Sequence, residues 1–352
     1  MSFSERAEID QIDQQLLALL NRRAQIAQSI GRQKNERGMP AYDASREKQV
    51  LERIIAASTG PLPTTSLRTI YREIISACRS LEQPITVAFL GPPATFTHMA
   101  TLQHFGSSVD TVPAATIADV FRIVEHGEAH YGVVPVENSN EGVESHTLDN
   151  LVQTDLKICA ETYLQVHQCL LSKSPLEAIR TVYSHPNALG QCQEWLRYNL
   201  PQANIVPVSS TSRGAELAAE EPHAAAIGAA LAAQVYGLDI LAERIEDHPN
   251  NRTRFLVIGT HDSPPTGKDK TSLTFMAPHR PGGLWDALGC FREYGINLTM
   301  IVSRPNRVKP FEYRFFVDIQ GHAREPRVHQ ALEAARQHCH AVAVLGSYPE
   351  AE

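Results

Sequence analysis

The sequence has no apolar run long enough to cross a membrane, and it starts with a charged, helix-forming segment instead of a signal peptide. Its six cysteines are scattered, with no Cys-x-x-Cys pair and no group of cysteine and histidine. This distribution argues against a disulfide framework and a structural zinc site, and it favours a reducing cytoplasm. Cations are outnumbered, because the net charge is -7. We therefore expect neither nucleic acid nor a membrane as a partner, and an anionic substrate must be bound by local cations.

Three segments with different patterns divide the chain. A hydrophobic content of 43% with 20% charged residues is typical of a globular protein, and a length of 352 residues predicts more than one domain. We place the domains at residues 1–83, 84–260 and 271–350. The polar, proline-rich segment 261–270 is expected to be a linker.

Residues 1–83 have a helical pattern throughout. Apolar residues recur at steps of three and four, without a glycine or proline before Gly31, at Ile9, Ile12, Leu16, Leu19, Ile26 and Ile30. A helix of roughly thirty residues is about 45 Å long, which exceeds what two shorter helices around 46–57 and 67–81 can cover. The pattern therefore predicts an intertwined homodimer in which the partner buries the rest of this stripe.

The other two segments contain strands. Residues 84–260 alternate strand-like and helix-like runs, which predicts an α/β domain. Its strands are expected at 85–91, 131–137, 158–171, 181–184, 204–209, 224–227 and 254–259. Residues 271–350 follow the order βαββαβ, at 272–277, 283–294, 298–303, 313–320, 327–338 and 341–346. This order predicts an α+β domain of the ferredoxin-like type.

Cations lie on the apolar stripe of the first helix. Arg23 and Lys34 fall in its middle, and Arg6 falls at its edge. A single long cation can extend from such a place to solvent, but two central cations with a third beside them are buried charges that need an anion. A pocket with several cations, few acids and no nucleophile is suited to a dianion whose reaction needs no proton transfer.

The motifs RxxIDxIDxxLLxLLxxR, GxxK and DxxRE, which begin at Arg6, resemble the all-helical chorismate mutase domain over essentially its whole length. A Claisen rearrangement of chorismate is unimolecular, so the protein needs only to hold the compact conformer and stabilise charge on the ether oxygen. The resemblance implies that the carboxylates are held by Arg23, Arg46 and, from a partner copy, Arg6. It implies that the ether oxygen is contacted by Lys34, supported by Asp43 and Glu47.

Glu82 occupies the position where this family carries Gln or Glu facing the same oxygen. A carboxyl group there can help only when it is protonated and acts as a donor. Burial favours the protonated form and Lys34 favours the ionised form, so the two effects oppose each other. The sequence leaves both forms open.

Four short polar stretches stand out in the central segment, each near the end of an expected strand: 91–97 (GPPATFT), 135–142 (PVENSNEG), 184–186 (SHP) and 251–255 (NRTRF). Strand ends are the usual place for ligand contacts in open α/β sheets. Taken singly, each stretch also has an ordinary interpretation as strand residues or turn formers.

Together and in this order, these stretches resemble prephenate dehydratase along its full length, which implies a two-lobed domain similar to periplasmic binding proteins. In that reaction prephenate loses its ring hydroxyl and ring carboxylate as the ring becomes aromatic. The resemblance implies that Thr253 is catalytic, as a hydrogen-bond donor or relay to the leaving hydroxyl, and that Arg254 binds a carboxylate. The remaining pocket residues are expected to be Thr95, Phe96, Asn138, Ser139, Ser184, Asn251 and Phe255.

One departure concerns the first of these stretches, where the family motif GPEGTF reads GPPATF, with Pro93 and Ala94. If the replaced glycine adopts a positive φ, Ala94 is strained there or the loop differs.

The last segment resembles the ACT regulatory domain, whose GALV and ESRP motifs bind phenylalanine between paired domains. This chain has GGLW at 282–285 and VSRP at 302–305 in their places. The resemblance implies an effector site that contains Gly282, Gly283, Leu284, Ser303, Arg304 and Pro305. The alternative is a dimerisation domain without a ligand.

The complete chain thus resembles bifunctional chorismate mutase/prephenate dehydratases with a C-terminal ACT domain. The resemblance implies two substrates, chorismate and prephenate, with phenylalanine as effector, in a homodimer or larger homo-oligomer without metal or cofactor. Two alternatives stay open. One is a catalytically weak sensor with the same fold, and the other is a dehydratase that prefers arogenate.

Overall fold

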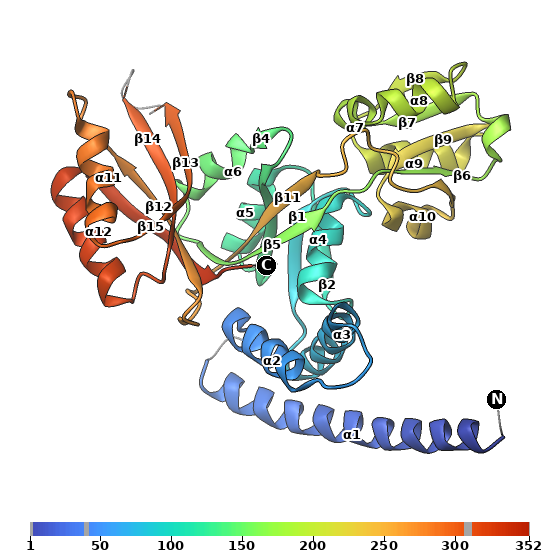
Figure 1. Cartoon of the computed structure of the whole chain (residues 1–352), viewed down its shortest axis with the longest axis horizontal. Coiled ribbons are helices and arrows are strands. Elements are labelled where there is room, and N and C mark those ends of the chain that lie inside the picture. Colours follow the sequence, from blue (N-terminus) through green and yellow to red (C-terminus); the bar gives the residue numbers. More distant parts are fainter. Residues whose placement is uncertain (1–2, 39–41, 306–311, 352) are drawn as a thin grey trace. The chain divides into compact units, whose positions relative to one another are not determined.

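The computed structural model describes residues 3–38, 42–305 and 312–351 (Figure 1). The chain forms two compact units, one of residues 1–86 with 102–110 and one of residues 87–101 with 111–352. Among the described helices, none is both long and apolar enough to span a bilayer.

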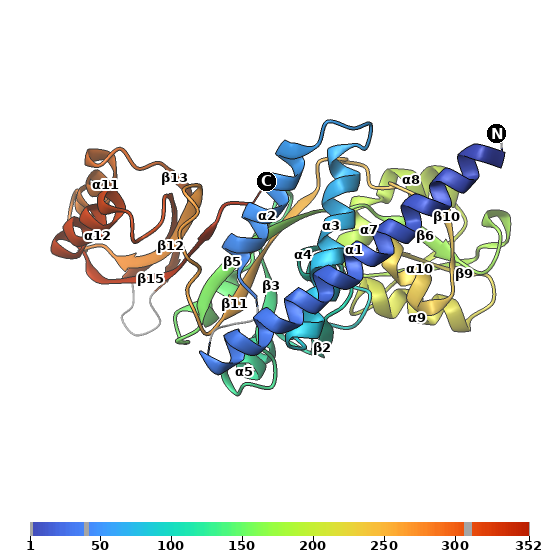
Figure 2. The ribbon, with the colours of Figure 1, turned by 90° about the horizontal axis from the view of Figure 1, so that it is seen from below.

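The first unit is helical, with α1 at Phe3–Glu36, α2 at Ala44–Ala57 and α3 at Thr64–Glu82. Asp43 caps α2, because its carboxylate accepts the backbone N–H of Arg46 at 3.0 Å. At 34 residues α1 is about 51 Å long, and its N-terminal part extends past α2 and α3 (Figures 1 and 2). The three predicted helices are confirmed.

The apolar stripe of α1 is left uncovered within the chain. Its members are 44–63% exposed, at Ile9, Ile12, Leu16, Leu19, Ile26 and Ile30. A soluble monomer rarely exposes a contiguous apolar face of this length, so the face requires another surface to cover it.

The second unit begins with a two-lobed α/β domain. The sheet of the first lobe has the order β2-β1-β3-β11-β5, with β4 paired to β3. Its strands are β1 (Thr86–Leu90), β2 (Asp110–Ala114), β3 (Tyr131–Asn138), β4 (Gly142–Val143), β5 (Lys157–Gln165) and β11 (Arg252–Gly259). Its helices are α4 (Phe96–Phe105), α5 (Ile117–Glu125) and α6 (Ser145–Leu151).

The second lobe has a sheet of order β10-β6-β9-β7-β8. Its strands are β6 (Cys169–Ser172), β7 (Thr181–Ser184), β8 (Asn204–Pro207), β9 (Ala224–Gly228) and β10 (Asp239–Ala242). Its helices are η1 (Leu176–Ala178), α7 (Pro186–Gln191), α8 (Gln193–Asn199), α9 (Thr211–Glu220) and α10 (Ala230–Tyr236). The single strand predicted at 158–171 is therefore wrong, because 166–168 carry the chain from β5 in one sheet to β6 in the other.

The last part of the second unit is an antiparallel sheet of order β13-β14-β12-β15 with two helices. Its elements are β12 (Asp269–Met276), α11 (Gly283–Glu293), β13 (Leu298–Pro305), β14 (Tyr313–Gln320), α12 (Pro326–His338) and β15 (His340–Pro349). The predicted βαββαβ order is confirmed.

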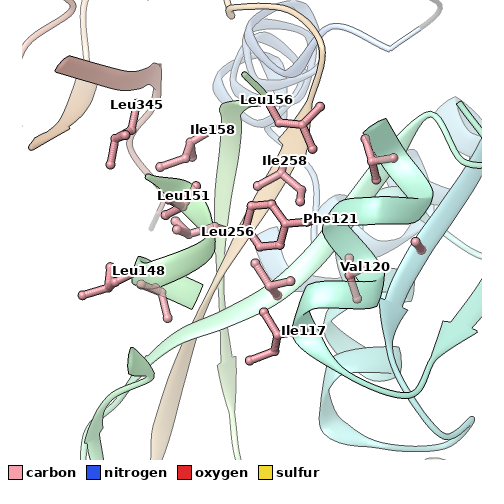
Figure 3. Close-up of a cluster of buried hydrophobic side chains, with 14 of the residues drawn as sticks. Ile117, Val120, Phe121, Leu148, Leu151, Leu156, Ile158, Leu256, Ile258 and Leu345 are labelled. Carbon is pink, nitrogen blue, oxygen red and sulfur yellow. The ribbon is translucent and has the colours of Figure 1, made fainter. Parts of the chain in front are cut away.

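The hydrophobic cores show how this sheet is covered on both faces. One cluster joins it to α11 and α12, through residues such as Phe275, Phe291 and Leu332. The other face carries Phe316 and Leu345, which belong to the same cluster as Leu148 and Leu256 of the first lobe (Figure 3). The first lobe therefore shares one core with residues 269–349, which we call the C-terminal module.

Candidate functional site

A cavity of about 320 Å³ lies among the three helices of the first unit. It is lined by Arg23, Ile26, Ala27, Ile30, Lys34, Asp43, Arg46, Glu47, Val50, Ile75, Cys78, Arg79 and Glu82. The cavity thus brings together every residue predicted for this site except Arg6, which is exposed on the first turns of α1. Four cations and three carboxyl groups line it, which leaves a surplus of positive charge.

The polar groups of this cavity are partly paired in the absence of a ligand. The ammonium of Lys34 lies 3.2 Å from the carboxylate of Glu82, and Arg23 donates to the carbonyl of Ile74 at 3.4 Å. Gly31 permits the close approach of α1 to α3, because a Cβ there would lie 2.7 Å from the Cα of Glu82.

Arg79 is a functional candidate that the sequence reasoning missed. Its guanidinium is buried, donates to the carboxylate of Glu47 and to the carbonyl of Phe105, and lies 5.3 Å from the ring centroid of Tyr42. Burial raises the pKa of Glu47, and Arg79 opposes that rise. Arg79 follows Ile75 by four residues on the apolar face of α3, so the reasoning that identified Arg23 would have found it.

A second cavity, of about 520 Å³, lies between the two lobes of the α/β domain. Four of the residues predicted for this site line it, namely Phe96, Asn138, Asn251 and Thr253. The first residues of α4 and α9 also reach it, through Phe96 and Thr211, so two helix N-termini direct their partial positive charge toward it. Among the described residues that line it there is neither Lys nor Arg.

The hydroxyl of Thr253 has a defined orientation. The side-chain amide nitrogen of Asn138 donates to the Thr253 hydroxyl oxygen and to the side-chain Oδ1 of Asn251, both at 2.7 Å. The Asn138 carbonyl oxygen accepts the backbone N–H groups of residues 140 and 141 at 2.9 and 3.1 Å, which fixes the amide in this orientation. Thr253 therefore accepts from Asn138, and its own proton is available to a ligand.

Other predicted pocket residues lie outside the cavity lining. The hydroxyls of Thr95, Ser139 and Ser184 donate to backbone carbonyls at 3.2, 2.9 and 2.6 Å, and Phe255 is buried within the sheet. In this structure they hold the loops and strands around the cavity, and their contact with a ligand stays a prediction.

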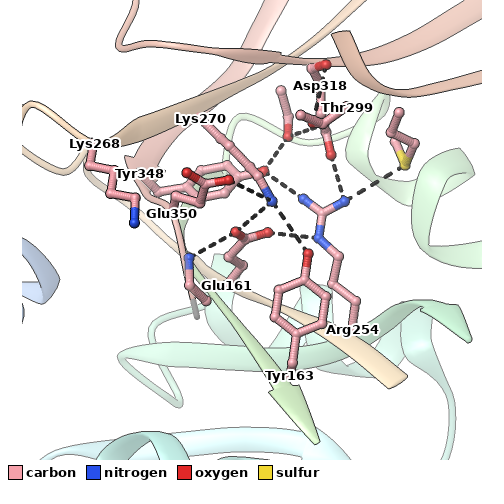
Figure 4. A network of polar contacts seen from close by, with 12 residues as sticks. Glu161, Tyr163, Arg254, Lys268, Lys270, Thr299, Asp318, Tyr348 and Glu350 are labelled. Carbon is pink, nitrogen blue, oxygen red and sulfur yellow. Dashed lines mark hydrogen bonds and ion pairs between the residues drawn. The ribbon is translucent and has the colours of Figure 1, made fainter. Parts of the chain in front are cut away.

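The expected role of Arg254 as a partner of a substrate carboxylate does not fit its position. Its side chain points away from the cavity, and its guanidinium donates to Glu161 at 2.7 Å, Asp318 at 2.5 Å and Tyr348 at 2.9 Å (Figure 4). Successive residues of a strand face opposite sides of the sheet, so Thr253 and Arg254 cannot both face the cavity.

Several amide and carboxylate groups of the cavity were missed. The Glu141 carboxylate accepts from the side chains of Asn187 at 2.7 Å and Gln191 at 3.1 Å, which connects the two lobes. Gln191 in turn accepts from Asn251 at 2.9 Å and from Gln168 at 3.1 Å. Asn187 and Gln191 belong to the stretch that begins at Ser184, so a longer reading of that stretch would have included them.

Ala94 adopts the positive φ expected of the glycine it replaces, at 65°. It is completely buried, and its N–H donates to His98 Nδ1 at 3.1 Å. Of the two alternatives that the sequence left open, the positive φ of Ala94 therefore favours the strained alanine.

The residues predicted for the effector site lie at the start of α11 and at the end of β13. Gly282 has a φ of 78°, and a Cβ on Gly283 would lie 2.2 Å from the carbonyl oxygen of Pro278, so both positions require glycine. Leu284 packs against the core, whereas Ser303 and Pro305 are exposed. Arg304 forms a two-point ion pair with Asp149 of α6, at 3.0 and 3.3 Å.

Within the described part of the chain, no group of three His, Cys, Asp or Glu side chains is arranged to hold a metal ion.

Comparison with known proteins identifies the three parts of the chain. Family models match for chorismate mutase type II at residues 5–83, prephenate dehydratase at 87–263 and the ACT domain at 271–337. The bifunctional chorismate mutase/prephenate dehydratase of Aquifex aeolicus is 47% identical over 98% of this chain and 97% of its own length.

Two solved structures resemble the chain after the helical unit. A prephenate dehydratase from Arthrobacter aurescens in complex with L-Phe has a TM-score of 0.70 and 35% identity, over 76% of this chain and 90% of its own. GqqA, described as a novel type of quorum quenching acylase, has a TM-score of 0.69 and 30% identity, over 75% of this chain and 97% of its own. From the full-length match to the Aquifex protein and the three domain models, this chain belongs to the family of bifunctional chorismate mutase/prephenate dehydratases.

Proposed function

We propose that this chain converts chorismate to prephenate in the helical cavity and prephenate to phenylpyruvate in the cavity between the lobes. The observation that carries the proposal is that Arg23, Lys34, Arg46 and Arg79 line one cavity of about 320 Å³ in a net-acidic chain. Such a group of cations is stable when an anion completes it. The family membership supplies the anion, chorismate, and the second cavity supplies a place for the next step.

In the mutase step, Arg23 and Arg46 bind the two carboxylates and so hold the compact conformer from which the bonds rearrange. Lys34 lies at the site to donate to the ether oxygen, where negative charge develops as the C–O bond breaks. Glu47 and Arg79 hold each other in a fixed orientation beside it. We assign Asp43 to capping α2 and thus to placing Arg46.

In the dehydratase step, Thr253 donates its available proton as a hydrogen bond to the leaving hydroxyl of prephenate. The C–O bond breaks, the bond to the ring carboxylate breaks with release of carbon dioxide, and its electron pair completes the aromatic ring. The departing hydroxide takes a proton from solvent and leaves as water. The described lining residues include no Lys or Arg, which favours this chemistry because a strong ion pair would stabilise the carboxylate that must be lost.

The carboxylates of prephenate are held by neutral donors in this proposal. Asn187 and Gln191 already bind the carboxylate of Glu141, so their geometry suits a carboxylate of the substrate. The N-termini of α4 and α9 add electrostatic attraction.

A second copy of the chain completes the mutase site. The exposed stripe of α1 needs a cover, and Arg6 lies on the part of α1 that extends past α2 and α3. Arg6→Ala and Arg23→Ala chains should each be inactive as mutases. After unfolding and refolding together at equal concentration, about half of the dimers are mixed, and each has one intact site, so about a quarter of the wild-type activity should return. Full absence of complementation would exclude a shared site.

We further propose that the three domains are bounded at 1–83, 84–260 and 271–350. The protein is proposed to act in the cytoplasm and to be inhibited by phenylalanine. The exposed edge strand β13, which carries Ser303 and Pro305, is suited to pairing with a second ACT module.

The experiment that tests the function supplies chorismate to the purified chain and follows prephenate and phenylpyruvate together. Formation of both products is the expected result, and a repeat with arogenate separates the two possible dehydratase substrates. A sensor that lacks catalysis would form neither product. A dehydratase with an eroded mutase domain would act only on added prephenate.

A further inference from the structure

A buried group of polar side chains lies directly behind Thr253. Thr253 and Arg254 are neighbours on β11; the first lines the cavity, whereas the second is 4% exposed on the opposite face of the sheet. One peptide unit joins the two residues, so a shift of the main chain at Arg254 also moves the main chain at Thr253.

All four strands of the C-terminal sheet contribute to this group. Its members from that sheet are Lys270 and Ser272 on β12, Met300 on β13, Asp318 on β14 and Tyr348 on β15. The first lobe contributes Arg254 on β11 and Glu161 on β5. The side chains that hold Arg254 in place thus come largely from the C-terminal module (Figure 4).

The hydrogen bonds of this group form a closed ring in which every donor is assigned, with Arg254 donating to both of its neighbours and Asp318 accepting from both of its own. Ser272 gives its only proton to Asp318, at 2.5 Å, so the hydroxyl of Tyr348 must donate to Ser272, at 2.6 Å. Arg254 donates to both ends, at 2.9 Å to Tyr348 and at 2.5 Å to Asp318. Burial raises the pKa of Tyr348 well above its ordinary value, which keeps this donor protonated.

The ladder beside Thr253 is interrupted on one side. The pairing of β11 with β3 shifts register between Arg254 and Phe255, so Arg254 faces Glu137 and Phe255 faces Pro135. The extra residue of this bulge is Val136 on β3, whereas β11 keeps a regular register with β5 from Arg252 to Val257. Thr253 and Arg254 therefore lie on a continuous stretch of β11, next to a break in its pairing with β3.

We propose that Arg254 is a positioning residue for the dehydratase reaction, and that the C-terminal module sets the direction of the Thr253 hydroxyl through the ring of Arg254, Asp318, Ser272 and Tyr348. This inference rests on the proposed function. It adds that a change within the C-terminal sheet alters the chemical step without touching the substrate.

Asp318→Asn tests the inference from the side of the C-terminal module. It removes the charge that holds one nitrogen of Arg254, and Asp318 does not line the cavity. A misplaced Thr253 loses an interaction made in the transition state, so we expect kcat for prephenate to fall by about 10-fold with KM changed by less than about 2-fold. Tyr348→Phe, which removes one hydroxyl of the ring and no charge, should lower kcat in the same way by about 3-fold.

Thr271→Val is the matched control. Thr271 is buried on the same strand as Ser272 but faces away from Arg254, and its hydroxyl bonds to the Gly321 carbonyl at 2.7 Å and to Ser347 at 2.8 Å. This variant should lower the melting temperature as the test variants do, and it should leave kcat unchanged.

Two results would overturn the inference. One is a wild-type kcat in both Asp318→Asn and Tyr348→Phe, and the other is a loss of kcat in Thr271→Val as large as theirs. The mutase rate of the same preparations measures the amount of folded helical unit. A wild-type chain without turnover of prephenate would instead refute the proposed function, so the two failures are distinguishable.

Discussion

Replacing Asn138 with aspartate reverses the polarity of its contact with Thr253 at almost constant shape. In the present structure the Asn138 amide nitrogen donates to the Thr253 hydroxyl at 2.7 Å, and its oxygen accepts two backbone N–H groups. An aspartate keeps those two backbone bonds but places an anionic acceptor beside Thr253. The Thr253 proton would then turn to the carboxylate, because hydrogen bonds to charged acceptors are the stronger ones.

The magnitude follows from the loss of one donor to the developing charge on the leaving oxygen. Removal of such a donor from an active site lowers kcat by about 10²- to 10³-fold, or about 3–4 kcal/mol. Asn138→Ala leaves the Thr253 proton without this competing acceptor and should cost less, about 10-fold. We therefore expect the order wild type, Ala, Asp for decreasing kcat.

The assay is phenylpyruvate formation from saturating prephenate, with the mutase rate of the same chain as the folding control. Thr253→Ser should retain most of the turnover, because it keeps a hydroxyl at the same position. If Asn138→Asp is as active as Asn138→Ala or more so, the Thr253 proton does not face the substrate and the reasoning fails.

Three further predictions concern the helical unit and the C-terminal module. Burial, together with the positive charges of Arg79 and Arg72, lowers the pKa of His104 from 6.5 to about 3. Between pH 6.5 and pH 3, His104 is therefore protonated in the unfolded chain but not in the folded one, so the stability of the fold falls as the pH drops through 6.5. At pH 5 this costs about 2 kcal/mol, and His104→Gln should remove that part of the loss in urea unfolding. Mutase activity should decline as the pH rises and Glu82→Gln should flatten the decline, whereas an unchanged profile in rate assays would remove Glu82 from the mechanism. Phenylalanine should change the fluorescence of Trp285, which is 68% exposed next to Leu284, and Trp285→Phe should abolish this change. If calorimetry detects no binding of phenylalanine, the C-terminal module has a structural role only.

The sequence predicted the parts of the fold that depend on local patterns. The helices of the first unit and the βαββαβ order follow from hydrophobic periodicity, and Arg23, Lys34 and Arg46 follow from cations on an apolar face. The error at 158–171 has a physical reason. Only residues 166–168 separate the two strands, and no glycine or proline marks the point where the chain leaves one sheet for the other.

Contacts between distant segments could not be predicted in this way. Gln191 and Asn251 are 60 positions apart and meet only because the two lobes close around one cavity. The orientation of Arg254, by contrast, could have been predicted from the sequence, because successive residues of a strand face opposite sides of the sheet and Thr253 faces the cavity. The prediction instead followed the usual association of arginine with carboxylate ligands.

The shared core of the first lobe and the C-terminal module has a consequence for dissecting the protein. The composition of residues 261–270 suggests that the chain could be divided there into two separately produced fragments. Such a division would expose Phe316, Leu345 and Tyr348 to water on one fragment and Leu148 and Leu256 on the other. It would also break the ion pair between Arg254 and Asp318, although Arg254 would keep Glu161 of its own lobe as a partner. We expect fragments separated at this segment to aggregate unless they are produced together, so a gene for either half alone is not a usable expression unit.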